Sequence, residues 1–277
     1  MEKDELFSVE DKICIVTGGL GQIGRNMVEE FEKRGAKVAV FIRTVTDERV
    51  HRIFPVDKYD YDRLHFYAVD INVKADIEKA LDQIEQCWGT PDVLVNNAGI
   101  DTQPSAPPEV SGPFEDFPEE VFREVVDTNL VGTFLMCQAV GKRMVKAGKG
   151  GSIINVGSIY GMLSPIQDIY AYKKEQTGVP FIKPVAYSAA KSGIYNLTRY
   201  LATYWGEKGI RVNTLTPAGV WRDTQDATFI HNFTERMPMK RMSHENEYNG
   251  AVIFLASKAS SFMTGSNLVI DGGWTAW

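Results

Sequence analysis

The chain has 277 residues, a length at the upper end for one α/β domain and enough to bury a sizeable core. Its net charge is −6 and its basic residues form no stripe, which argues against nucleic acid or an anionic membrane surface as a partner. The acidic first ten residues and the lack of any apolar run of about 18 residues predict no targeting or membrane-spanning segment. These exclusions leave small-molecule chemistry as the favoured class of function.

The cysteines and histidines give no sign of a disulfide or a metal. Cys14, Cys87 and Cys137 lie in apolar stretches without C-x-x-C spacing, so we expect reduced thiols in the core of a cytoplasmic protein. The four histidines are His51, His65, His231 and His244. They lack ligand spacing such as H-x-x-x-H, and no metal site is predicted.

Short β-branched runs alternate with longer amphipathic stretches along the chain. The runs predicted as strands are 12–17, 37–41, 65–69, 93–95, 152–156, 211–215 and 267–270. The stretches predicted as helices are 23–34, 74–88, 119–145, 185–206 and 245–256. Repeated β-α units of this kind predict a doubly wound parallel sheet with helices on both faces, in one α/β domain spanning 1–277.

Three segments interrupt this rhythm and are rich in turn formers or polar residues: 101–118, 160–184 and 219–243. In a doubly wound sheet, ligands bind beyond the carboxyl ends of the strands, and the first two segments directly follow such ends. We expect these segments to form the walls of a substrate pocket. A solvated surface loop is the alternative for each of them.

The first predicted strand runs straight into a glycine-rich turn and then into a helix. Gly19, Gly21 and Gly24 satisfy the pattern G-x-G-x-x-G in this context. Such glycines let the backbone approach a pyrophosphate at a helix N-terminus. The turn therefore predicts a dinucleotide site, with tight strand-helix packing alone as the alternative.

The end of the second strand bears on the choice of cofactor. An acidic residue there would bind the ribose 2′-hydroxyl of NAD, whereas a basic residue accommodates the 2′-phosphate of NADP. The chain has Ile42 where the acid is expected and Arg43 beside it, which favours NADP unless Arg43 is an ordinary solvated arginine. Asp70, at the end of the third strand, is suited to an adenine amine.

Tyr187 and Lys191 are four residues apart, so on a helix they share one face. A free tyrosine has a pKa of about 10, and work near pH 7 requires a shift of roughly 3 units, which a lysine beneath the phenol would favour. We therefore expect Tyr187 to act as an acid/base. Chance spacing on an amphipathic helix is the alternative.

Taken together, these residues resemble the short-chain dehydrogenase/reductase family over about 11–277. The matching pieces are the turn at 17–24, Asp70, Asn96-Asn97-Ala98-Gly99, Asn129, Ser158, Tyr187 with Lys191, Pro217, and Asp271-Gly272-Gly273. The resemblance implies a Rossmann-like sheet of strand order 3-2-1-4-5-6-7. It also implies assembly through the long helices after strands four and five, as a dimer or tetramer.

By the same resemblance, Tyr187 transfers the proton and Ser158 hydrogen-bonds the substrate oxygen. Lys191 lowers the tyrosine pKa and holds the nicotinamide ribose, and Asn129 anchors a water chain. Hydride transfer between a nicotinamide and a carbon requires no metal. The cofactor-binding residues so implied are Thr17, Gly18, Gly19, Gly21, Gln22, Ile23, Gly24, Arg43, Thr44, Asp70, Ile71, Asn97, Ala98, Gly99, Tyr187, Lys191, Pro217, Gly219 and Val220.

Two features depart from the family's usual pattern. Gln22 stands where small single-domain members carry the middle glycine of the turn, a spacing similar to that of larger relatives acting on nucleotide sugars. The interval from Ser158 to Tyr187 is much longer than the usual dozen residues, which predicts an inserted loop at 159–184 beside the catalytic pair. This insertion and the C-terminal sequence resemble the branch that includes flagellin-modification oxidoreductases.

The insertion offers groups that could recognise a carbohydrate, including an acidic or phosphorylated one. Tyr170 and Tyr172 could stack on a sugar ring. The cations expected to meet an anionic group are Lys173, Lys174 and Lys183, with Arg222 from the loop at 219–243. Contact of the insertion with a partner subunit is the alternative.

The sequence thus predicts an oxidoreductase that uses NADP, or less favourably NAD, on a secondary alcohol or ketone of a carbohydrate, in surface-glycan precursor synthesis. One alternative is a sugar-acid dehydrogenase of the gluconate or mannonate type. A second is a redox-neutral sugar epimerase, which the glycine spacing of the first turn invites. A third is a non-catalytic cofactor-binding regulatory or scaffold protein, which would not need an acid/base residue.

Overall fold

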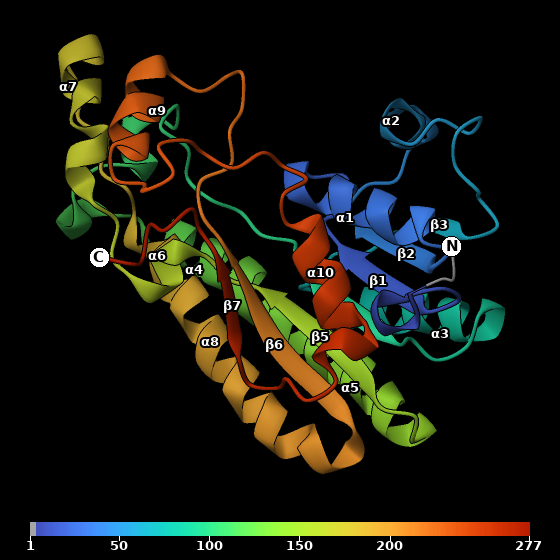
Figure 1. Ribbon diagram of the computed structural model, residues 1–277. Helices are drawn as coiled ribbons and strands as arrows, with labels where there is room; N and C mark the ends of the chain where they lie inside the picture. The colour runs from blue at the N-terminus through green and yellow to red at the C-terminus, as the bar shows by residue number, and fades with distance from the viewer. Residues whose placement is uncertain (1–3) are drawn as a thin grey trace.

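The computed structural model describes residues 4–277, which form one seven-stranded sheet with helices on both faces (Figure 1). The strands are β1 (Ile13–Thr17), β2 (Lys37–Ile42), β3 (Leu64–Ala68), β4 (Val93–Asn96), β5 (Gly151–Val156), β6 (Ile210–Pro217) and β7 (Asn267–Ile270). All neighbours pair in parallel, in the order β3-β2-β1-β4-β5-β6-β7. The predicted single Rossmann-like domain and its strand order are confirmed.

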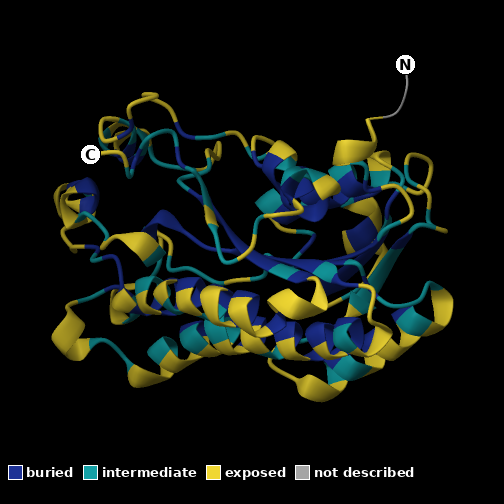
Figure 2. Ribbon diagram, turned by 60° about the horizontal axis from the view of Figure 1, so that its bottom comes forward, coloured by how far each residue is buried: buried dark blue, intermediate teal, exposed yellow. Residues whose placement is uncertain are grey.

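The helices cover the sheet in two layers. They are α1 (Gln22–Lys33), α2 (Asp47–Ile53), α3 (Lys74–Cys87), α4 (Glu119–Val126), α5 (Gly132–Ala147), α6 (Ile159–Met162), α7 (Tyr172–Thr177), α8 (Val185–Trp205), α9 (Ala227–Thr234) and α10 (Asn249–Ala256). One core lies between the sheet, α1 and α10, and a second lies between the sheet, α3, α5 and α8. Figure 2 shows buried residues in the sheet and on the helix faces turned toward it. None of the helices within 4–277 is long and apolar enough to cross a bilayer.

Some local predictions differ from the structure. The helix expected over 119–145 is divided by a π-helical turn at Asp127–Val131, and that turn buries the polar side chain of Asn129. The helix expected from residue 245 begins only at Asn249, because Glu247 instead accepts hydrogen bonds from Arg241 and from the backbone of His244. The prediction that all three cysteines lie in the core is wrong for Cys87, which is exposed near the end of α3.

A third, smaller core lies above the carboxyl ends of the strands. The insertion at 159–184 is folded into α6, a 3₁₀ turn at Gln167–Tyr170, and α7. Its Tyr170 ring stacks on Phe229 of α9, with ring centroids 5.7 Å apart, and the cluster also includes Phe233 and Trp274. The insertion and the 219–243 segment therefore form one packed unit at this edge of the sheet (Figure 1).

Candidate active site

A cavity of about 1150 Å³ runs along the carboxyl ends of the strands. The glycine-rich turn and the ends of β2 and β3 line one part of it, and the insertion and the 219–243 segment line the other. The sequence-predicted residues that line it are Gly18, Gly21, Gln22, Ile23, Arg43, Thr44, Asp70, Ile71, Asn97, Ala98, Gly99, Ser158, Tyr187, Lys191, Pro217, Gly219 and Val220. One continuous cavity thus joins the predicted cofactor and substrate residues.

Three predicted cofactor residues lie behind the cavity wall and support it. Thr17 is buried, and its hydroxyl accepts hydrogen bonds from the backbone amides of Asn97 at 3.0 Å and Ala98 at 2.9 Å. A Cβ on Gly19 would lie 2.6 Å from Val40 Cγ1, and one on Gly24 would lie 2.5 Å from the carbonyl oxygen of Gly18. These residues hold β1, β4 and α1 in close contact.

The turn into α1 fits the diphosphate of a dinucleotide. Gly21 is the N-cap of α1, and no side chain caps this helix end. A Cβ on Gly21 would have only the carbonyl oxygen of Gly18 nearby, at 3.1 Å, so the missing side chain leaves the first-turn amides open to the cavity. Uncapped amides and the helix dipole together favour an anion at this end.

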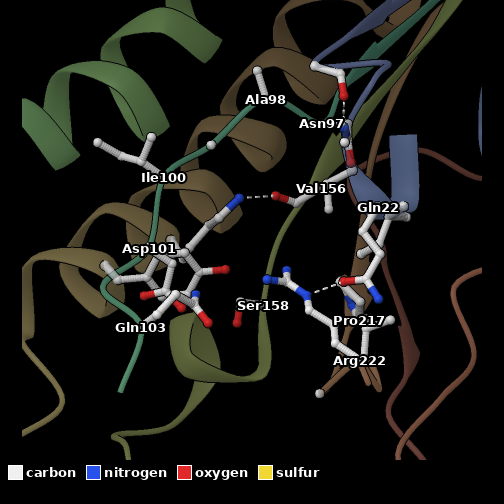
Figure 3. Close-up of a pocket in the computed structure, with 18 of the residues that line it drawn as sticks. Gln22, Asn97, Ala98, Ile100, Asp101, Gln103, Val156, Ser158, Pro217 and Arg222 are labelled. Carbon is white, nitrogen blue, oxygen red and sulfur yellow. Dashed lines mark hydrogen bonds between the residues drawn. The ribbon is translucent and has the colours of Figure 1, made fainter. Parts of the chain in front are cut away.

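Gln22 uses its side chain to cross the cavity instead of leaving space as glycine would. Its Nε2 donates to the carbonyl of Trp221 at 2.7 Å, and its Oε1 accepts from Nε of Arg222 (Figure 3). The glycine position that departs from the family pattern therefore connects the turn to the segment after β6. Arg222, predicted as a candidate partner for a substrate anion, is already engaged by this contact.

The opposite end of the cavity carries two exposed arginines. Arg43 follows β2, and Arg49 comes from the first turn of α2; both line the cavity. Arg49 was not predicted from the sequence. The signal that could have found it is Thr46, which accepts a hydrogen bond from the Arg49 amide at 3.3 Å as the N-cap of α2.

The catalytic residues predicted from the sequence come together at the centre of the cavity. Ser158 is two residues beyond the end of β5 and lines the cavity with Tyr187 of α8, near enough to affect the pKa of the tyrosine. Lys191, one helical turn further along, is 4% exposed, and its ammonium donates to the carbonyl of Val156 at 2.7 Å. Its nitrogen lies 5.8 Å from the centroid of the Tyr187 ring.

The prediction that the Tyr187 pKa is lowered is wrong for this state of the protein. Burial and the negative charge of Asp101 raise the pKa of Tyr187, and the Ser158 side chain opposes this rise only in part. Burial also lowers the pKa of Lys191 to about 8, with Asp101 partly opposing that shift. The Lys191 ammonium donates to the Val156 carbonyl instead of to the Tyr187 phenol.

Asn129 lies behind the cavity, completely buried in the π-helical turn. Its side-chain oxygen accepts from the amide of Ile100 and its nitrogen donates to the Ile100 carbonyl, both at 2.8 Å. The side chain thus fixes the backbone that follows β4. Its predicted role in a water chain stays a prediction.

A second buried lysine, Lys183, also lies near Tyr187. Its ammonium lies 5.6 Å from the Tyr187 ring centroid and donates to both carboxylate oxygens of Asp101, at 2.6 and 2.7 Å. Lys183 therefore does not offer a free charge to a substrate anion. Lys174 is exposed and lies outside the cavity lining, whereas Lys173 lines it.

Asp101, Gln103 and Asp226, which were not predicted as site residues, line the cavity with the predicted Tyr170 and Tyr172. Asp101 and Asp226 lie in loops, where a single acidic residue is most often solvated, so nothing in the sequence indicates that they face a site. Within 4–277, no group of three or more His, Cys, Asp or Glu side chains is arranged to hold a metal ion.

Known proteins resemble this chain over almost its full length. A family model described as Enoyl-(Acyl carrier protein) reductase matches residues 20–275. The chain is 31% identical to a protein named NAD-dependent glycerol dehydrogenase from Listeria innocua, over 98% of this chain and 97% of the relative.

Two solved structures share the fold closely. A short chain dehydrogenase from Leptospira borgpetersenii with bound NAD+ has a TM-score of 0.83 at 34% identity, over 99% of this chain and 97% of that one. A gluconate 5-dehydrogenase from Burkholderia cenocepacia in complex with NADP and tartrate has a TM-score of 0.82 at 28% identity, over 99% and 98%. With a family match over most of its length and a site of this composition, the chain is a member of the short-chain dehydrogenase/reductase family of NAD(P)-dependent enzymes.

Proposed function

We propose that this enzyme interconverts a secondary alcohol and a ketone on a carbohydrate and prefers NADP to NAD. The observation that carries the proposal is the group formed by Ser158, Tyr187 and Lys191 inside a cavity whose substrate end is lined by polar side chains. A positioned proton donor beside a nicotinamide site is the arrangement that carbonyl reduction requires.

The bound nicotinamide would supply or accept the hydride, while residues of the chain manage the charge on the substrate oxygen. In the reducing direction, the Tyr187 hydroxyl gives its proton to that oxygen as the carbonyl becomes an alcohol, and Ser158 donates a hydrogen bond to the same oxygen. The raised pKa of Tyr187 keeps this proton in place near neutral pH. Lys191, held by the Val156 carbonyl, would hold the ribose. Its positive charge would also stabilise the tyrosinate that remains once the proton has left.

Support for NADP comes from the arginines at the adenosine end. Arg43 and Arg49 both line the cavity beside Thr44, and the Ile42 side chain is buried where an acid would bind the ribose hydroxyls. Charge-assisted hydrogen bonds to a 2′-phosphate typically contribute about 1.5–3 kcal/mol, or roughly 10- to 150-fold in affinity. Similar proteins occur with either cofactor, so the choice rests on these two side chains.

The carbohydrate substrate is supported by the cavity and by the relatives. Hydroxyl-rich molecules require many hydrogen-bonding groups, and Asp101, Gln103, Gln225 and Asp226 supply them at the substrate end. The named relative acts on glycerol and one structural neighbour is a gluconate dehydrogenase, which keeps the sugar-acid alternative open to test. The flagellin-modification branch and the surface-glycan context stay predictions.

The test uses the purified full-length enzyme with glycerol, threitol, sorbitol and gluconate, each with NADP or NAD, followed by absorbance at the nicotinamide band. We expect turnover of a polyol with appearance of reduced NADP. Arg43→Ala and Arg49→Ala should each weaken NADP more than NAD. Turnover of simple alcohols only would contradict the carbohydrate assignment, and equal affinity for the two cofactors in all variants would contradict the NADP preference.

A further inference from the structure

The ion pair of Asp101 and Lys183 joins a partly exposed carboxylate to a buried ammonium. The Lys183 side chain is 4% exposed, and its ammonium donates to Asp101 Oδ1, to Asp101 Oδ2 and, at 2.8 Å, to the Thr102 carbonyl. An ammonium has three donors, and these three acceptors use all of them. Lys183 is therefore a fixed support whose charge and donors are both satisfied.

The backbone of Lys183 is fixed as firmly as its side chain. Gln167 of the insertion accepts from the Lys183 amide at 2.9 Å and donates to its carbonyl at 3.1 Å. Asp101 lies on the segment after β4, whose position Asn129 sets through Ile100. The pair thus joins the insertion to the end of β4 and holds the carboxylate in one orientation.

The Asp101 carboxylate differs from its partner in exposure. Its side chain is 27% exposed and lines the cavity, on the opposite side of Ser158 from Gln22 and Arg222 (Figure 3). A carboxylate offers about four lone-pair sites, and Lys183 uses one on each oxygen. No other hydrogen bond from the described residues reaches it, so acceptor sites remain on its cavity side.

This acceptor lies close to the catalytic residues. Its partner Lys183 has its ammonium 5.6 Å from the centroid of the Tyr187 ring, and the Asp101 charge acts on Tyr187, on Lys191 and on the Tyr160–Tyr170 pair. A substrate whose oxygen is held by Tyr187 and Ser158 would have its neighbouring carbon in the part of the cavity that Asp101 lines. A hydroxyl there would meet an acceptor, whereas a carboxylate or phosphate there would meet a like charge.

We infer that Asp101, oriented by Lys183, is a specificity-determining residue that accepts a hydrogen bond from the hydroxyl on the carbon adjacent to the reacting carbon. The substrate is then a vicinal diol, or the matching hydroxyketone, that is uncharged at this adjacent position. This inference rests on the proposed function, because it names which carbohydrates the same site takes. It assigns no anion-binding role to Lys183.

The experiment compares three small alcohols that differ only beside the carbinol: propane-1,2-diol, propan-2-ol and lactate. The wild-type enzyme should have the highest kcat/KM for the diol. In Asp101→Asn, kcat/KM for the diol should fall roughly 10- to 150-fold, the range of a charge-assisted hydrogen bond, while the value for propan-2-ol changes far less. The preference for the diol over lactate should narrow in the same variant, because the like charge is gone.

Asp101→Asn leaves the Lys183 ammonium buried without its counter-charge, which is strongly destabilising in itself. The double variant Asp101→Asn/Lys183→Met removes both charges and should show the same loss of selectivity if the single variant does not fold. Asp168→Asn removes an exposed carboxylate of the insertion outside the cavity lining and serves as the matched control.

Equal losses on propane-1,2-diol and propan-2-ol in these variants would overturn the inference, since Asp101 would then act only through Tyr187 or through folding. A wild-type preference for lactate over the diol would overturn it as well. If the wild-type enzyme turns over none of glycerol, threitol, sorbitol and gluconate, the proposed function itself fails. Polyol turnover without diol selectivity removes only the present inference.

Discussion

Two buried lysines lie near the Tyr187 ring, with their nitrogens 5.6 and 5.8 Å from its centroid. Lys191 belongs to α8 and donates to a backbone carbonyl, and no carboxylate within residues 4–277 pairs with it; burial lowers its pKa to about 8. Lys183 belongs to the insertion on the substrate side and is neutralised by Asp101. The two lysines are equally buried but differ in role. The charge of Lys191 is available to the catalytic tyrosine, whereas the charge of Lys183 holds Asp101 in place.

The two lysines also differ in their effect on the groups around them. An unpaired buried ammonium is costly and tends to lose its proton, which suits a group acting on a nearby proton donor. A paired one stays charged and orders its partner, here the segments after β4 and before α8. Replacing Lys191 should therefore reduce kcat more than stability, and replacing Lys183 should reduce stability more than kcat.

The largest effect is expected for Tyr187→Phe. The ring stays in place, but the proton donor is lost, and such donors typically contribute 10²- to 10⁴-fold, so kcat should fall by about that range or more. Cofactor affinity should remain close to that of the wild type. Steady-state kinetics and a cofactor titration measure the two quantities, and a folded variant that keeps more than a tenth of the wild-type kcat would remove Tyr187 from the acid/base role.

Lys191→Met should also abolish most turnover. The pH dependence of its stability tests the lowered pKa of Lys191 more directly. The folded-state pKa of about 8 lies below the ordinary 10.5, so the unfolded chain binds more protons between these values, and wild-type stability gains from this group as pH rises through that window. Methionine has no such group. Chemical denaturation from pH 7 to 10.5 should show the wild type gaining relative to the variant, and parallel curves would contradict the lowered pKa.

The glycine-rich turn and the Tyr187–Lys191 pair could be read from the sequence, whereas the contact between Asp101 and Lys183 could not, for a physical reason. Glycines at 18–24 and the Tyr187–Lys191 spacing act through local backbone geometry, which short sequence patterns record. Lys183 and Asp101 are 82 residues apart, and nothing local in either segment announces their contact. Lys183 even stands four residues before Tyr187, but Pro184 begins α8 only after it, so helical spacing does not describe its position.

Lys183→Met tests the other half of the comparison. Breaking a buried pair by removing one partner costs about 3–5 kcal/mol, and the partial exposure of Asp101 allows hydration that reduces this to about 1–3 kcal/mol. We expect a larger loss of stability than in Lys191→Met at pH 7, with a smaller loss of kcat. Denaturant unfolding measures the stability, and kinetics at saturating cofactor measure kcat. The reverse ranking of the two variants in either quantity would contradict the separate roles given to the two lysines.

The smallest effect is expected on the substrate wall, in a pair of tyrosines two residues apart. The Tyr170 hydroxyl is hydrogen-bonded to that of Tyr160 at 3.1 Å, whereas the Tyr172 hydroxyl is buried and has no hydrogen-bond partner among the described residues. Tyr170→Phe breaks a buried hydrogen bond and leaves the Tyr160 hydroxyl unpaired, which should cost about 1–3 kcal/mol.

Tyr172→Phe removes an unsatisfied group and should leave the free energy of unfolding unchanged or raise it by up to about 1 kcal/mol. Both variants keep the aromatic ring that packs in the insertion core, so the difference between them isolates the hydroxyl. Thermal or denaturant unfolding at one pH decides the ranking. A different result would be a rise of about tenfold in the KM of Tyr172→Phe for a polyol, with unchanged stability. The Tyr172 hydroxyl would then bind substrate, as we infer for Asp101.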